Sequence, residues 1–323
     1  MSSGNLIELN EQRFSRVYMC GIVGLFFKNP KFNRKLGSYL GEMLVRMSDR
    51  GPDSAGLAVY SEQTNCAVKL TLRFDIPELA KELELNLSNK LISKFSVRLR
   101  GSHVVLEFLK EDYEKVLEVL SSFQNPPRIL SEGSKIEIFK EVGPPKEFVD
   151  QFKFHDFEGT HGIGHTRMAT ESAVTTMGAH PFSTGSDQCL VHNGSLSNHN
   201  SVRRKLIQDG VQFETNNDSE VAACYLTQKM SSGLTLRSAL TESLDDLDGF
   251  FTFVVATSRG FGVLRDRIAC KPAVLAETND YVAFGSEYRA LTDLPDIDVA
   301  KVWEPEPAKV YFWEHSDESF RFR

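Results

Sequence analysis

The sequence has few cysteines, no long apolar run and no excess of positive charge. Its five cysteines are scattered and form no C-x-x-C pair, so a disulfide framework is not predicted and a reducing, cytoplasmic compartment is expected. No apolar stretch approaches the roughly 18 residues that a membrane span needs. With a net charge of −7, the chain lacks the broad positive field of a nucleic-acid binder.

The composition is that of a globular enzyme. The 323 residues are 41% hydrophobic and 25% charged, enough for one or two domains with a substantial core. Residues 1–18 mix both charge signs and lack the apolar core of a secretory signal. The class of protein that fits is one that acts on a small molecule, with neither nucleic acid nor a membrane as partner.

The N-terminal part predicts a buried strand followed by a helix. The apolar run at 20–27 has the length and composition of a buried strand. Leu40, Met43, Leu44 and Met47 then fall at helical spacing. A turn-rich loop at 50–56 leads into a further strand at 57–60.

From about Cys66 to Asp156 the composition shifts toward Lys, Glu, Leu and Val, with few glycines. The periodicity predicts elements in the order β-α-β-β-α-β, which is typical of a ferredoxin-like unit. The expected strands are 67–74, 95–100, 103–109 and 135–141, and the expected helices are 77–87 and 111–123. We therefore expect an inserted α+β subdomain that ends near Pro144 and Pro145.

The C-terminal part predicts strands and helices that fit a layered helix/sheet/sheet/helix core. The expected strands are 161–166, 188–192, 250–256, 262–264, 273–276, 281–284 and 310–313, and the expected helices are 198–208, one that begins after Asp218, and 236–247. Asp218 is expected to be the N-cap of its helix.

Three polar clusters follow predicted strands or precede a helix, at 165–167, 192–194 and 217–220. Arg167 offers a planar fork for a carboxylate, and Asp218 a counter-charge for an ammonium group. The Asn193 amide and the Gly194 N–H are two donors for a developing oxyanion. Together these groups describe a pocket for an amino acid whose distal carbonyl is attacked.

These clusters, with residues 19–24 (MCGIVG) and 50–56 (RGPDSAG), resemble the motifs of the class II glutamine amidotransferases in their family order. The resemblance covers about 20–65 and 158–290. It implies an N-terminal-nucleophile hydrolase with a four-layer αββα sandwich and glutaminase activity. The expected domains are 20–65 with 157–323 as the amidotransferase domain, and 66–156 as the insertion.

Carried over from the family, Cys20 is the nucleophile, and its own free α-amino group is the general base. Asn193 and Gly194 form the oxyanion hole. Arg167 and Asp218 bind the α-carboxylate and α-amino group of L-glutamine, and Thr170 and His180 line the pocket.

Residues 168–172, 190–198, 265–272 and 284–291 resemble the stand-alone amidotransferase subunit of glutamate-synthase-like systems, including N-methylglutamate synthase. This branch implies that ammonia passes to separate synthase subunits of a hetero-oligomer. Glu171 stands where relatives that aminate sugar phosphates carry His. No cofactor is expected on this chain.

The resemblance requires the nucleophile to be the first residue of the mature chain, whereas Cys20 is preceded by nineteen residues. We expect residues 1–19 to be either a cleaved leader or a misassigned start. Translation from Met19 with removal of the methionine is the favoured interpretation.

Three alternatives stay open. In the first alternative the chain is a non-catalytic glutamine-binding or regulatory subunit. In the second it hydrolyses a different amide, although Arg167 and Asp218 favour a free amino acid as substrate. The third concerns three charged residues. Arg265, Lys271 and Glu287 line an ammonia exit or a partner interface, or simply form surface salt bridges. His165, His180 and His192 are interpreted as structural, hydrogen-bonded groups, and no metal site is expected.

Overall fold

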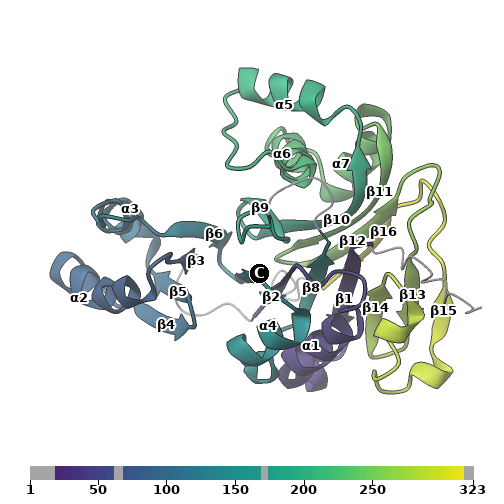
Figure 1. The fold of residues 1–323 in the computed structure, drawn as a ribbon, viewed down its shortest axis with the longest axis horizontal. Coiled ribbons are helices and arrows are strands. Elements are labelled where there is room, and N and C mark those ends of the chain that lie inside the picture. The colour runs from purple at the N-terminus through teal and green to yellow at the C-terminus, as the bar shows by residue number, and fades with distance from the viewer. Residues whose placement is uncertain (1–18, 62–67, 169–173, 316–323) are drawn as a thin grey trace, which may run out of the picture.

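The computed structural model describes residues 19–61, 68–168 and 174–315, whose strands form three antiparallel sheets (Figure 1). The seven-stranded sheet has the order β15 (Lys301–Trp303), β13 (Val274–Glu277), β14 (Tyr281–Gly285), β1 (Gly21–Phe27), β8 (His161–Arg167), β2 (Ser54–Tyr60) and β7 (Ile136–Val142). The five-stranded sheet has the order β16 (Tyr311–Glu314), β12 (Gly260–Arg265), β11 (Gly249–Thr257), β10 (Gln188–Leu196) and β9 (Phe182–Gly185).

Helices cover the outer faces of these two sheets. Those beside the seven-stranded sheet are α1 (Leu36–Arg46) and α4 (Pro145–Phe152). Those beside the five-stranded sheet are α5 (His199–Gln208), α6 (Asp218–Ser231) and α7 (Leu236–Asp246). Short 3-10 turns occupy Pro30–Lys35, Pro77–Leu79, Lys110–Asp112, Phe154–Asp156, Tyr288–Ala290 and Ile297–Val299. No helix within the described ranges has the length and apolarity to cross a membrane.

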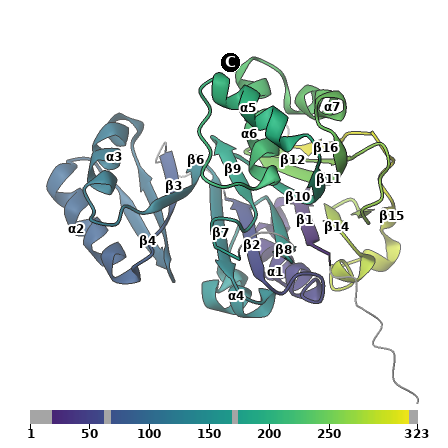
Figure 2. The same cartoon turned by 45° about the horizontal axis from the view of Figure 1, so that its top comes forward.

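Side-chain alternation along the strands explains how the layers pack. On β1, Val23 and Leu25 join the apolar cluster under α1 and α4, whereas Ile22 and Phe26 join a second cluster that faces the other sheet. The same period of two places Val254 of β11 in the inter-sheet cluster. The two sheets therefore pack face to face, with helices outside each (Figure 2).

Polar groups also tie the two sheets together. The Tyr60 hydroxyl on β2 donates to the Ala256 carbonyl on β11 at 3.0 Å. His161 Nε2 on β8 lies 2.7 Å from the Thr257 carbonyl, so this ring nitrogen carries the proton. Each bond satisfies a buried polar group inside the inter-sheet core, and this fixes how the two sheets are placed relative to each other.

The third sheet forms a separate unit beside the other two (Figure 1). Its strand order is β4 (Ser96–Arg100), β5 (His103–Phe108), β3 (Val68–Arg73) and β6 (Arg128–Gly133), and α2 (Ala80–Lys90) and α3 (Tyr113–Ser121) pack on it around an apolar cluster of their own. The sequence of strands and helices along the chain is β-α-β-β-α-β.

One strand of this unit was predicted wrongly. The strand expected at 135–141 is β7, which pairs with β2 in the seven-stranded sheet, and β6 completes the four-stranded sheet instead. β7 carries a buried apolar residue on each face: Ile138 faces the inter-sheet core, and Phe139 faces the cluster under α1 and α4. Because only a short turn separates β6 from β7, the pattern did not distinguish the two strands.

A buried group of charges joins the unit to the main body. Lys69 on β3 lies 3.0 Å from Glu137 on β7 and 3.6 Å from Glu107 on β5. Arg98 on β4 lies 2.7 Å from Glu137 and 3.1 Å from Glu107. Lys69 and Glu137 are almost fully buried, so each charge depends on its partners for compensation.

We expect Lys69→Ala to lower the free energy of unfolding by about 3 kcal/mol, because two buried carboxylates would lose the buried ammonium group that lies between them. The matched control is Lys146→Ala, which breaks an exposed ion pair with Asp150. That control should change stability by less than about 0.5 kcal/mol. Guanidinium denaturation measures the free energy of unfolding of both variants. An equal loss of stability in the two would contradict a stabilising role for the buried charges.

Candidate functional site

Cys20 lies directly before β1, and two side chains hold its backbone carbonyl. Asn193 Nδ2, from β10 of the five-stranded sheet, donates to this oxygen at 3.0 Å. Arg50 Nε, from the turn after α1, donates to the same oxygen at 3.0 Å. The carbonyl of Cys20 is thus fixed by groups from both halves of the core.

Arg50 is held in turn by the segment after β14. Its Nη1 donates to Glu287, which also lies 2.7 Å from Arg289 Nε. The neighbouring Ser286 accepts from the Ile22 amide through its hydroxyl and donates its own amide to the Ile22 carbonyl, both at 2.9 Å. Residues 286–287 therefore support the chain on either side of the Cys20–Gly21 bond.

The thiol of Cys20 lies 4.0 Å from the Met168 carbonyl. Burial raises the pKa of this thiol, while the Met168 contact and the positive charges of Arg167, Lys271 and Arg50 oppose the rise without cancelling it. Most of the thiol is protonated at neutral pH, so a base is needed to make it a nucleophile.

Gly194 follows Asn193 on β10 at a backbone conformation that favours glycine, with φ +149°. A Cβ at this position would lie 2.0 Å from the Phe250 carbonyl, so a larger residue would displace β11. This close approach fixes the backbone at Gly194, the residue that follows Asn193 on β10.

Arg167 is the buried last residue of β8, and its carbonyl accepts from the Asp53 amide at 3.1 Å. A Cβ on Gly51 would lie 2.5 Å from the Arg167 carbonyl carbon, so the 50–53 turn packs tightly on the end of β8. The turn that contains Arg50, whose side chain reaches Cys20, is thereby held against the end of β8.

Asp218 is the first residue of α6, and its Oδ2 accepts from the Leu196 amide at 2.9 Å. The prediction that Asp218 is the N-cap was wrong. Asn217 caps the helix instead, accepting from the Ser219 amide at 2.9 Å. This frees the Asp218 carboxylate to tie the end of β10 to the start of α6.

The three histidines predicted to be structural and hydrogen-bonded are all buried. The hydrogen-bonding part is wrong for His180, whose two ring nitrogens have no hydrogen-bond partner among the described residues. His165 stacks on His180 with ring centroids 4.0 Å apart, and its Nε2 lies 3.0 Å from the His192 carbonyl. His192 Nδ1 lies 2.9 Å from the Ser219 hydroxyl. Burial lowers the pKa of all three, that of His165 to about 3, so the rings are neutral at physiological pH.

The structure brings Cys20 and Asn193 into contact, with Gly194 next to Asn193 in the chain, and places Arg167 at the end of β8 and Asp218 at the start of α6. Thr170 and Glu171 lie outside the described residues. In the described ranges no cluster of three or more His, Cys, Asp or Glu side chains is arranged to hold a metal.

The sequence interpretation missed the roles of three residues, Arg50, Glu287 and Ser219. Arg50 lies in one of the quoted motifs, but nothing in that pattern showed that its guanidinium reaches the carbonyl of the nucleophile. For Glu287 an exit, an interface and a surface salt bridge were all left open, and the structure shows it in ion pairs with Arg50 and Arg289. Only the fold brings these distant residues together.

Comparison with known proteins agrees with the family resemblance of the sequence motifs. The family profile of the glutamine amidotransferase domain matches residues 165–293. The chain is similar to the glutamine amidotransferase-like protein GlxB of Rhizobium meliloti (strain 1021), with 58% identity over 298 residues, which cover 92% of this chain and 99% of the relative. A provisionally named glutamine amidotransferase of Methanothermobacter thermautotrophicus is 32% identical over 91% of this chain and 99% of its own length.

Among solved structures, glutamine phosphoribosylpyrophosphate amidotransferase from B. subtilis superposes with a TM-score of 0.56 at 19% identity. The alignment covers 91% of this chain and 47% of that enzyme, so the chain spans about half the length of that protein. At this identity the likeness concerns the fold, and the α+β fold of the chain matches it.

We expect stability to fall as the pH drops below the ordinary histidine pKa of about 6.5. The folded pKa of His165 is about 3, so between these values the unfolded chain binds a proton that the folded chain does not. Each histidine of this kind should cost about 1.4 kcal/mol between pH 7.5 and 5.5. Denaturant unfolding of the native chain and of His165→Gln measures this cost. The variant should show a flatter dependence on pH, and an identical dependence would contradict the prediction.

Proposed function

The chain belongs to the class II glutamine amidotransferases, and from this premise and the contacts at Cys20 we propose that it hydrolyses L-glutamine to L-glutamate and ammonia. The observation that carries the proposal is the 3.0 Å bond from the Asn193 amide to the Cys20 carbonyl. This bond supports the proposal because it brings the side-chain amide of Asn193, the proposed oxyanion donor, to the residue that bears the thiol. An amide NH₂ group has two N–H bonds, so Asn193 can hold Cys20 with one and bind substrate with the other.

In the first step, the Cys20 sulfur attacks the side-chain amide carbon of glutamine, and a C–S bond forms. The amide oxygen becomes an oxyanion, which accepts from Asn193 Nδ2 and the Gly194 N–H. The C–N bond then breaks, and ammonia leaves with the proton taken from the thiol. Water hydrolyses the resulting thioester, which releases glutamate and restores the thiol.

The base in this scheme is the α-amino group of Cys20. Burial raises the pKa of the thiol, so a neighbouring group must accept its proton. An α-amine titrates near 8, about where a thiol does, and is therefore well matched to this transfer. The chemistry requires Cys20 to become the first residue, by cleavage of a leader at 1–19 or by removal of Met19 after initiation there.

The substrate groups that do not react are held by charge. Arg167 forms a bidentate contact with the α-carboxylate of glutamine, and Asp218 pairs with its α-ammonium. His180 and Thr170 are both proposed to line the wall of the glutamine pocket. This clamp favours a free amino acid over an N-acylated one or a peptide.

We further propose that the facing sheets and their outer helices form the αββα sandwich of the N-terminal-nucleophile hydrolases, with the four-stranded unit as an inserted ferredoxin-like subdomain of the 66–156 region. The antiparallel order β4-β5-β3-β6 supports the subdomain assignment. Resemblance at 265–272 and 284–291 supports delivery of ammonia to a separate synthase subunit, glutamate-synthase-like or N-methylglutamate-synthase-like, in the cytoplasm. Identification of co-purifying chains tests that partner.

We expect protein that begins at Cys20 to hydrolyse glutamine, and Cys20→Ala to lower this activity at least roughly 1000-fold, because no other group replaces the thiol. Release of glutamate and ammonia is measured, with intact mass to define the N-terminus. The control is Cys270→Ala, which removes an exposed thiol and should keep full activity.

Two outcomes would count against this scheme. Native-rate hydrolysis by Cys20→Ala would remove the nucleophile assignment. Glutamine binding without hydrolysis by protein that begins at Cys20 would favour the alternative of a non-catalytic, glutamine-binding subunit.

We expect Asp218→Asn to raise the KM for glutamine roughly 10- to 100-fold with a smaller change in kcat, because the ammonium loses its counter-charge. Asparagine keeps an acceptor for the Leu196 amide, so the end of β10 stays tied to α6. Asp209→Asn, at an exposed carboxylate bonded to Gln228, is the matched control. Equal KM values in the two variants would exclude Asp218 from the clamp.

A further inference from the structure

Lys140 is a charged residue at a position where the pattern of β7 calls for an apolar one. Ile136 and Ile138 face the inter-sheet core, and Lys140 follows them on the same face of the strand. Its side chain is not exposed at the sheet edge, because the residue is 3% exposed. A lysine is rarely buried to this extent without specific partners.

The partners are three backbone carbonyls of one loop. Lys140 Nζ donates to Ala179 at 3.0 Å, to Met177 at 3.2 Å and to Pro181 at 3.4 Å. An ammonium group has three N–H bonds, and the loop provides one carbonyl acceptor for each of them. The loop at 177–181 is therefore wound around the end of this side chain.

The same loop lies between the two side chains proposed to clamp glutamine. A Cβ on Gly178 would lie 3.1 Å from Arg167 Nη1, and the Gly178 carbonyl accepts from Asn217 Nδ2 at 3.4 Å. Asn217 caps α6, whose first residue is Asp218. Two residues further along, His180 stacks on His165. Movement of the loop would therefore change the surroundings of both ends of the clamp.

The four-stranded unit contacts the start of this loop through the residue next to Lys140. Glu141 accepts a hydrogen bond from the Thr176 hydroxyl. Its carboxylate also lies 3.6 Å from Arg73 Nε on β3 and 3.3 Å from the Ser102 hydroxyl between β4 and β5. Adjacent residues of β7 thus connect the loop to the main sheet and to the unit.

From this geometry we propose that Lys140 is a positioning residue that holds the 177–181 wall of the glutamine pocket in its binding shape. The assignment of glutamine as the ligand rests on the proposed function. Lys140 acts through the loop and does not touch substrate, so its loss weakens substrate binding more than it slows chemistry.

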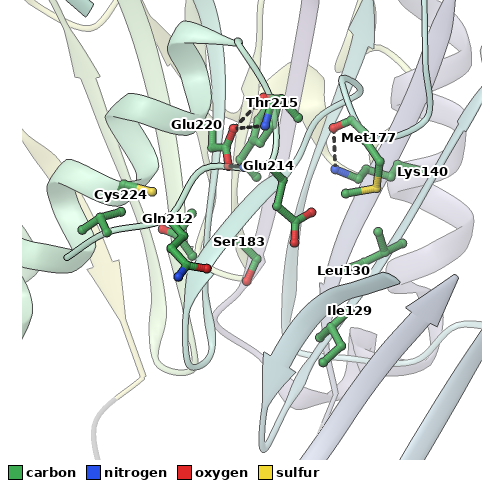
Figure 3. Close-up of a pocket in the computed structure, with 13 residues that line it drawn as sticks. Ile129, Leu130, Lys140, Met177, Ser183, Gln212, Glu214, Thr215, Glu220 and Cys224 are labelled. Atoms are coloured by element: carbon green, nitrogen blue, oxygen red, sulfur yellow. Dashed lines mark hydrogen bonds between the residues drawn. The ribbon is translucent and has the colours of Figure 1, made fainter. Parts of the chain in front are cut away.

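The surroundings of Lys140 make this support sensitive to pH. Burial lowers its pKa to about 8, against the opposing charges of Glu214 and Glu220. The other charged or titratable groups that face it are Arg73, His103 and His180. Figure 3 shows Lys140 bonded to Met177 on the wall of a cavity of about 340 Å³ that Glu214 and Glu220 also line. A neutral amine has only two N–H bonds for three carbonyls, so the loop loses one bond above this pKa.

The first test replaces Lys140 by methionine, which keeps the length of the side chain and removes the donors. We expect Lys140→Met to raise the KM for glutamine roughly 10- to 100-fold while kcat changes less than about threefold. Lys140→Arg, which keeps the charge, should recover part of the loss. Lys146→Met, at an exposed lysine of α4, is the matched control and should behave as the native chain. An unchanged KM in folded Lys140→Met overturns the proposal.

The second test does not depend on glutamine. Hydrogen exchange of the peptide that covers 174–182 should be faster in Lys140→Met than in the native chain and in Lys146→Met at pH 7. The native peptide should itself exchange faster, after correction for intrinsic rates, as the pH rises through about 8, whereas Lys140→Met should show no such step.

The two measurements separate this proposal from the one on which it rests. Unchanged exchange in Lys140→Met overturns the positioning role, whether or not glutamine is a substrate. If exchange is faster in Lys140→Met but the native protein neither binds nor hydrolyses glutamine, Lys140 does hold the loop and the proposed function is overturned.

Discussion

The hydrogen bonds to the Cys20 carbonyl are the interaction on which the site depends. Asn193 reaches this oxygen from the five-stranded sheet, and Arg50 reaches it from the turn that follows α1. The Asn193 bond can exist only if the two sheets keep their relative placement, which the inter-sheet apolar cluster and the Tyr60 and His161 bonds maintain. The packing of the core therefore sets the geometry of the candidate nucleophile.

Much of the fold could be predicted from the sequence because apolar periodicity reports local structure. The strand at 20–27, the helix through Leu40 and Leu44, and the neighbouring strands at 250–256 and 262–264 all agree with the structure. Residues of the candidate site could be named because short motifs carry them. What the motifs could not provide was contact between them, since the bond from Asn193 to Cys20 spans 173 positions of the chain.

The errors have physical reasons. β6 and β7 were not separated because only a short turn divides two strands of similar composition, although they enter different sheets. Asn217, not Asp218, caps α6, and both residue types suit that position. Lys140 was not considered at all, although its place in the alternation with Ile136 and Ile138 marks it as an ionisable side chain on an inward face. A polar residue in phase with a buried strand is a signal that can be looked for in other sequences.

The strands on either side of the four-stranded unit, β2 and β7, pair with each other, with Tyr60 opposite Ile136 and the Ser61 amide bonded to the Lys135 carbonyl at 3.2 Å. In topological terms the whole unit is one enlarged hairpin turn, which leaves and re-enters its parent sheet at neighbouring positions. The entropic cost of closing such a turn grows only slowly with its length. Closure of the backbone between β2 and β7 is therefore compatible with a short turn or an unrelated domain at this place, and what ties the present unit to the parent sheet is a set of side-chain contacts that includes those of Glu137 and Glu141.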